Sequence, residues 1–96
     1  MSLQVRYFSA AWCKRCVTLK PDFIEHCKIL GVEPEWIDFD SLDDDSEMKR
    51  AIEALPTMMV RAEVTAPWEM YTASTFNDFK IRSSELSLTA TITDGF

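Results

Sequence analysis

The feature that most constrains the fold of this chain is a pair of cysteines, Cys13 and Cys16, at a junction between two kinds of local pattern. An apolar, strand-like run over residues 3–8 precedes the pair, and a helical pattern follows over residues 13–30. Backbone N–H groups and the dipole at a helix N-terminus favour a thiolate. Residues three apart share a face of one helical turn, so their Cα atoms fall in the roughly 4.4–6.8 Å window of a disulfide. The pattern therefore predicts a reversible redox dithiol.

The size and charge of the chain restrict its class and its partners. A sequence of 96 residues makes one small domain, and a net charge of −6 argues against nucleic acid or an anionic membrane as a partner. No apolar run approaches the roughly 20 residues of a membrane span, and the first residues lack the pattern of a signal peptide. An odd count of three cysteines is a poor framework for a secreted disulfide scaffold. We therefore expect a cytoplasmic monomer.

Periodicity along the chain predicts the order strand, helix, strand, helix, strand, strand, helix. A parallel pair with a crossover helix, followed by a hairpin, gives an α/β fold of the form βαβαββα, with a four-stranded mixed sheet flanked by helices. We assign residues 1–84 to one domain, and expect residues 85–96 to form a C-terminal strand or a loose tail because apolar and polar residues alternate there. Such a strand would cover the open edge of the second strand or pair with another chain. The expected elements span residues 3–8, 13–30, 35–40, 44–54, 58–61 and 68–71, with a last helix from 74 onward.

The predicted interior consists mainly of aromatic residues and two adjacent methionines in the short third strand. Gly31 is the expected stop of the first helix, since glycine readily adopts the left-handed conformation that ends helices. The core candidates are Phe8, Phe23, Trp36, Phe39, Met58, Met59, Phe76 and Phe79.

A structural zinc site is the competing interpretation of the cysteine pair, with Cys13, Cys16, His26 and Cys27 as candidate ligands. On a continuous helix, Cys27 lies about 16 Å along the axis from Cys16, at a rise of 1.5 Å per residue. Zn–S bonds of about 2.3 Å cannot bridge that separation. We therefore favour redox chemistry without a metal, and we interpret Cys27 as a small buried apolar residue and His26 as a surface residue.

The chain resembles the thioredoxin superfamily in three motifs at matching separations: Trp12-Cys13-X-X-Cys16, Pro21 five residues after the second cysteine, and Leu55-Pro56-Thr57 before the third strand. The resemblance covers residues 3–79. Because the chain starts at what would be the second strand of a thioredoxin, the implied plan is a thioredoxin fold lacking the first strand and helix. In that respect it is closer to glutaredoxins and to the short redoxins of some phages.

The resemblance implies a thiol–disulfide oxidoreductase that reduces protein disulfides and needs no cofactor besides its own redox-active disulfide. Cys13 would be the exposed nucleophile and Cys16 the buried resolving thiol, while Trp12 would flank the site as an apolar platform. Ribonucleotide reductase is one implied target, and thioredoxin reductase or glutathione is the implied reductant. The peptide bond before Pro56 would be cis. The segments implied to bind the substrate backbone are Leu55, Pro56, Thr57, Thr72 and Ala73.

The chain also departs from its relatives at the site. Tyr7 stands where thioredoxins place a buried Asp, and Lys14 and Arg15 replace the usual Gly-Pro between the cysteines. Both cations would stabilise the thiolate of Cys13 and so tune its acidity, which predicts a couple less reducing than that of thioredoxin. The Gly-Gly of the glutaredoxin glutathione site is replaced by residues 72–74, Thr-Ala-Ser. The alternatives are a glutathione-dependent or more oxidising redoxin, and a non-catalytic binding module with the same fold.

Overall fold

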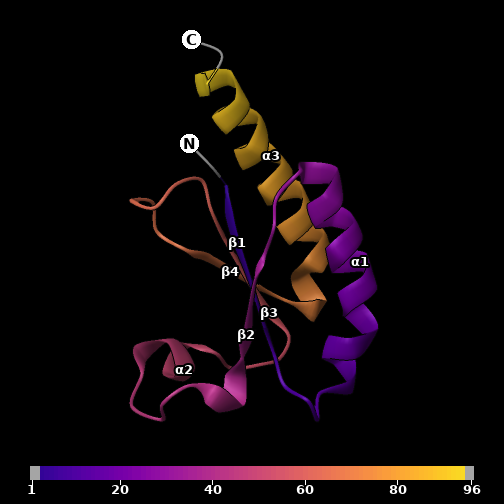
Figure 1. Ribbon diagram of the computed structural model, residues 1–96, viewed down its shortest axis with the longest axis vertical. Helices are drawn as coiled ribbons and strands as arrows, with labels where there is room; N and C mark the ends of the chain where they lie inside the picture. Colours follow the sequence, from indigo (N-terminus) through magenta and orange to yellow (C-terminus); the bar gives the residue numbers. More distant parts are fainter. Residues whose placement is uncertain (1–2, 95–96) are drawn as a thin grey trace.

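The computed structural model describes residues 3–94, with side chains described as far as residue 88. Its helices and strands follow the order predicted from the sequence (Figure 1). Two short 3-10 turns, η1 (Phe39–Ser41) and η2 (Ala73–Thr75), lie between them. The elements are β1 (Gln4–Ser9), α1 (Lys14–Leu30), β2 (Glu35–Asp38), α2 (Glu47–Ala51), β3 (Thr57–Arg61), β4 (Glu69–Thr72) and α3 (Phe76–Asp94).

The four strands form one mixed sheet in the order β2-β1-β3-β4. β1 pairs in parallel with β2, as a crossover through α1 requires, and Tyr7 lies opposite Trp36 in this register. β3 runs antiparallel to both β1 and β4, with Tyr7 opposite Met58. The predicted α/β class, with a four-stranded mixed sheet flanked by helices, is confirmed, and β2 is an edge strand.

Helices cover both faces of the sheet because side chains alternate between faces along each strand. On one face, Tyr7 packs in a core cluster with Phe23 of α1 and Phe79 of α3. On the other face, Phe8 packs with Ile52, directly after α2. Figure 1 shows α1 and α3 together along one side of the sheet, while the short α2 lies near the far end of the other. Met58 and Met59 are both buried, as predicted, on opposite faces.

Gly31 ends α1 and sets the entry into β2. Its φ of 71° is left-handed, and its N–H donates to the carbonyl oxygen of Lys28 (3.1 Å). The N–H of Val32 then donates to the carbonyl of Cys27 (3.0 Å), which closes the last turn. The predicted helix stop is therefore confirmed.

The prediction of a strand or loose tail over 85–96 was wrong for the described part of that segment. Residues 85–94 continue α3, so the proposed domain limit after residue 84 falls inside a helix. Leu86 packs in the same cluster as Phe79, seven residues earlier, whereas Leu88 is exposed. Burial therefore follows the helical period and not the alternation of a strand. The last two residues lie outside the described part of the chain.

Other boundaries and burial assignments also differ from prediction. Trp36 is 46% exposed because it lies on the edge strand, although its indole makes edge-to-face contacts with the rings of Tyr7 and Phe23. β2 ends at Asp38, where the chain turns into η1, and Phe39 is half-buried. The predicted helix over 44–54 is reduced to α2, with the acidic residues before it in a turn.

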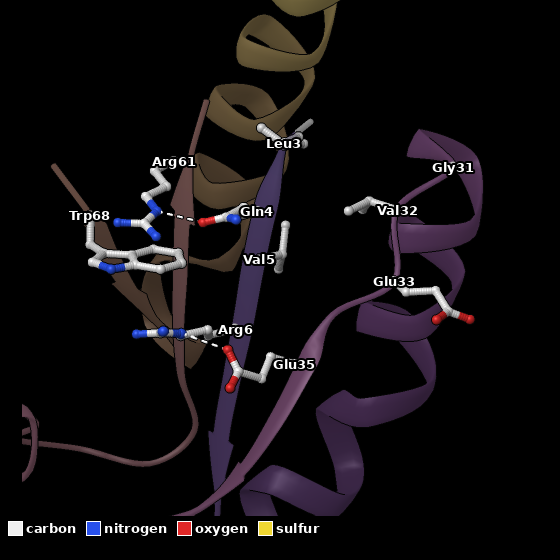
Figure 2. Close-up of a pocket in the computed structure, with 10 residues that line it drawn as sticks. All are labelled: Leu3, Gln4, Val5, Arg6, Gly31, Val32, Glu33, Glu35, Arg61 and Trp68. Atoms are coloured by element: carbon white, nitrogen blue, oxygen red, sulfur yellow. Dashed lines mark hydrogen bonds and ion pairs between the residues drawn. The ribbon is translucent and has the colours of Figure 1, made fainter. Parts of the chain in front are cut away.

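A polar cluster covers the sheet at the start of β1. Figure 2 shows the indole of Trp68 between the guanidinium groups of Arg6 and Arg61, whose Cζ atoms lie 4.3 and 4.1 Å from the ring centroid. The Nε of Arg6 donates to Glu35 (2.8 Å), and that of Arg61 donates to Gln4 (2.7 Å). A hollow of about 450 Å³ opens beside this cluster. It lies at the opposite end of β1 from the cysteines. No helix in the described part of the chain is both long and apolar enough to cross a membrane.

Candidate redox site

Cys13 and Cys16 form a disulfide where the loop after β1 enters α1. Their Cα atoms are 5.3 Å apart, inside the range that disulfides require. Cys13 is the N-cap of α1, and the backbone N–H of Cys16 donates to its Sγ (3.1 Å). A turn in which the N–H of Cys13 donates to the carbonyl of Ala10 (3.0 Å) holds the loop. Strand, turn and cap together place a sulfur atom directly at the helix N-terminus.

Both cysteines are buried in the disulfide form, with Cys13 6% and Cys16 2% exposed. They pack with Ala10, and Leu55 lies against the same cluster. The expectation of an exposed Cys13 is therefore wrong for this form, because the S–S bond and the N–H of Cys16 hold its sulfur inward. The expected burial of Cys16 is confirmed.

The open flank of the disulfide is apolar and cationic. Trp12 is 65% exposed, and Lys14 and Arg15 are exposed on the first turn of α1. A shallow hollow of about 330 Å³ runs between Trp12, Cys13 and Val17. A polypeptide that reaches Cys13 from this side would lie on the indole and beside the two cations.

Asp40 fixes the orientation of Trp12, a role that sequence reasoning missed. The indole Nε1 donates to Oδ2 of Asp40 (2.9 Å), which belongs to η1. The backbone N–H of Asp40 in turn donates to the carboxylate of Asp38 (3.1 Å), so the turn itself is braced. In the sequence, Asp40 is one carboxylate among several in an acidic stretch, and nothing in its spacing distinguished it.

The segment before β3 reaches the disulfide through Leu55. The Leu55–Pro56 peptide bond is cis, and Pro56 is fully buried. Thr57 is also buried, and its Oγ1 donates to the carbonyl of Ala54 (2.6 Å). Thr72 lies opposite Thr57 at the end of β4. The structure thus brings Leu55 against the cysteines, while Thr72 and Ala73 lie beyond β3, one strand further away.

Tyr7 occupies the space beneath the first turn of α1. Its hydroxyl donates to the carbonyl oxygen of Cys16 (2.7 Å), and its side chain is 1% exposed. Burial raises the pKa of Tyr7 to about 12, so the phenol is neutral at physiological pH. Its ring centroid lies 4.5 Å from that of Phe23. A neutral hydrogen-bond donor therefore tethers the helix backbone at Cys16.

His26 and Cys27, neighbours in α1, are both buried. Nε2 of His26 lies 2.8 Å from Oγ of Ser83, so the prediction of a surface histidine was wrong: α3 covers it. Burial, and secondarily the charge of Lys80, lowers the pKa of His26. Cys27 is a free buried thiol whose pKa burial raises to about 11. Among the described residues, no three His, Cys, Asp or Glu side chains are grouped closely enough to hold a metal ion.

Comparisons with known proteins assign the fold. No family model and no curated protein matches the sequence. Among solved structures, the thioredoxin of Fasciola hepatica matches with a TM-score of 0.65 and 21% identity over 85% of this chain and 81% of that one. The reduced thioredoxin pre-protein of Schistosoma mansoni matches with a TM-score of 0.66 and 24% identity over 84% and 78%. Thioredoxin f2 of Chlamydomonas reinhardtii matches with a TM-score of 0.64 and 19% identity over 81% and 72%.

These matches show that the chain has the thioredoxin fold, the fold that its motifs implied.

Proposed function

We propose that this protein is a thiol–disulfide oxidoreductase of the thioredoxin type, which exchanges electrons with protein disulfides through Cys13 and Cys16. The observation that carries this proposal is the closed Cys13–Cys16 disulfide at the N-terminus of α1. Its position on a thioredoxin fold, beside an exposed indole and Leu55, supports the same conclusion.

The proposed exchange has two steps. In the first, the thiolate of reduced Cys13 attacks one sulfur of a substrate disulfide, forms a mixed disulfide and releases the other substrate sulfur as a thiolate. In the second, Cys16 loses its proton and attacks Sγ of Cys13, which releases the second substrate sulfur and closes the Cys13–Cys16 disulfide. In the net reaction, two electrons and two protons pass from the dithiol of Cys13 and Cys16 to the substrate disulfide, which becomes two thiols.

The surrounding residues have separate roles in this proposal. The N–H of Cys16 and the helix N-terminus stabilise negative charge on Cys13, and Lys14 and Arg15 add cationic charge beside it. A stabilised reduced form makes the couple less reducing than thioredoxin, whose potential is about −270 mV. Trp12, oriented by Asp40, would provide the apolar platform for the substrate.

The substrate and the reductant are also proposals. The segment 55–57 would contact the substrate backbone, with Thr72 and Ala73 at the border of that contact. Ribonucleotide reductase is one proposed substrate, and the proposed reductant is thioredoxin reductase or glutathione, in a cytoplasmic setting. The exchange would use the Cys13–Cys16 disulfide without another cofactor.

Insulin-disulfide reduction tests the proposal. The purified protein is supplied in turn with dithiothreitol, with thioredoxin reductase and NADPH, and with glutathione. We expect turnover that disappears in Cys13→Ser and persists in Cys27→Ser, the matched control at the free cysteine. The identity of the reductant that supports turnover separates a thioredoxin-like role from a glutaredoxin-like one. Absence of turnover with all three, from protein with an intact dithiol, would refute the proposal in favour of a binding module.

A further inference from the structure

One edge of the sheet is open along β2. This strand is outermost in the sheet and pairs with β1 on its inner side. A row of its backbone N–H and C=O groups therefore faces away from the sheet. Residues 86–93, considered as a cover for this edge, instead continue α3. Within residues 3–94, no other strand pairs with β2, so the edge can accept one more strand.

A groove lies beside this edge and reaches Cys16. It is a hollow of about 420 Å³ between β2 and the first turns of α1, and Cys16 is one of the residues that line it. Trp36 and Val17 line it from opposite sides and are 46% and 65% exposed. Nζ of Lys20 lies 5.1 Å from the indole centroid of Trp36 at the rim. A strand added to β2 would place alternate side chains into this largely apolar groove.

The end of β2 nearest the cysteines is negatively charged. Asp38 and Asp40 are both exposed, and their carboxylates accept hydrogen bonds from a backbone N–H and from Trp12. Neither carboxylate forms an ion pair with a cation among the described side chains, whereas Glu35 at the other end of β2 pairs with Arg6 (2.8 Å). A basic residue of an added strand would therefore be favoured beside Asp38 and Asp40.

A second copy of this chain is a poor occupant of the edge. Antiparallel pairing of two β2 strands over all four residues would place Glu35 opposite Asp38 at both ends. Like charges directly opposite one another destabilise strand pairing, and short charged edges commonly prevent self-association. The same charges favour a partner that carries basic residues.

We propose that the open edge of β2 binds an extended segment of another protein as a fifth strand, with apolar side chains over Trp36 and Val17 and a basic side chain beside Asp38 and Asp40. This binding requires no electron transfer, and it is therefore independent of the proposed redox function.

The test is an NMR titration of the ¹⁵N-labelled oxidised protein with the capped peptide Arg-Thr-Val-Thr-Val-Arg. We expect shifts of the amide signals confined to β2 and the groove, together with slower hydrogen exchange of β2 amides. The matched peptide Glu-Thr-Val-Thr-Val-Glu should bind about tenfold or more weakly, because like charges oppose it. N-methylation of alternate amides of the basic peptide should abolish binding, because it removes the backbone donors.

Variants complete the test. Val17→Lys, which places a cation in the groove, should weaken binding of the basic peptide, whereas Ile81→Lys, at a 61% exposed position on α3, should leave it unchanged. Cys13→Ser should retain the affinity for the peptide even though it stops insulin reduction, which separates this proposal from the redox one. No binding at millimolar peptide, equal binding of the acidic peptide, equal losses in Val17→Lys and Ile81→Lys, or concentration-dependent self-pairing through β2 would overturn the proposal.

Discussion

Tyr7 offers a direct measure of how the core supports the redox site. Its hydroxyl donates to the carbonyl oxygen of Cys16 (2.7 Å) from a fully buried position. Tyr7→Phe removes this hydrogen bond and keeps the ring, which packs 4.5 Å from Phe23 between centroids. A buried intramolecular hydrogen bond contributes about 0.5–1.5 kcal/mol net. We therefore expect Tyr7→Phe to lower the free energy of unfolding by about 1 kcal/mol.

Urea denaturation followed by circular dichroism measures this change. For a domain of this size, about 1 kcal/mol corresponds to a fall in Tm of about 4–8 °C. The hydroxyl contacts the backbone and not a sulfur atom, so the loss should appear in both the oxidised and the reduced protein. Tyr71→Phe is the matched control: the hydroxyl of Tyr71 donates to Glu69 at 3.2 Å from a half-buried position, and its removal should cost less than about 0.5 kcal/mol.

Three results would contradict this role of the Tyr7 hydroxyl. Unchanged stability of Tyr7→Phe would mean that the hydrogen bond does not hold the first turn of α1. Equal losses in Tyr7→Phe and Tyr71→Phe would remove any special role of the buried position. A loss in one redox form alone would mean that Tyr7 acts through the sulfur chemistry instead of the helix backbone.

Three further predictions follow from burial. Burial and the charge of Lys80 lower the pKa of His26, so the unfolded state binds a proton more readily than the native state. The free energy of unfolding should therefore fall from about pH 7.5 to about pH 5.5, and His26→Gln should reduce this pH dependence in urea denaturation. An unchanged pH dependence in His26→Gln would contradict the lowered pKa of His26. Burial raises the pKa of Cys27 to about 11, so in the Cys13→Ser, Cys16→Ser double variant the Cys27 thiol should not react with Ellman's reagent until the protein unfolds. Rapid reaction of the native double variant would refute the burial of Cys27. Leu86→Ala should cost about 2–5 kcal/mol by denaturation while Leu88→Ala costs little, and similar costs for the two would argue against the helical period of α3.

The features that could be predicted from the sequence are local ones. The strand, the cysteine pair and the helix are adjacent in the chain, so periodicity and helix-end chemistry were sufficient to place Cys13 at the N-terminus of α1. Gly31 at the other end of the helix followed from the same local rules. The hairpin of β3 and β4 also depends on a short connection. Each of these features needs little knowledge of distant segments.

The predictions that were wrong concern residues whose environment depends on contacts between distant segments of the chain. His26 is buried because Ser83, 57 residues later, lies 2.8 Å away, and the pattern of α1 alone cannot show this. An apolar–polar alternation around Leu86 suits a strand, but packing against Phe79 selects the helix. Trp36 is aromatic enough for a core, yet its place on the edge strand leaves it half-open. In each case, tertiary packing overrides a local preference.

The most direct test of exchange through Cys13 and Cys16 is to trap the mixed disulfide. Reduced Cys16→Ser protein is mixed with insulin whose disulfides are intact. The products are then separated without reductant and mapped by mass spectrometry. We expect a covalent adduct between insulin and Cys13 that accumulates because the resolving thiol is absent. No adduct, or an adduct at Cys27 instead, would contradict it.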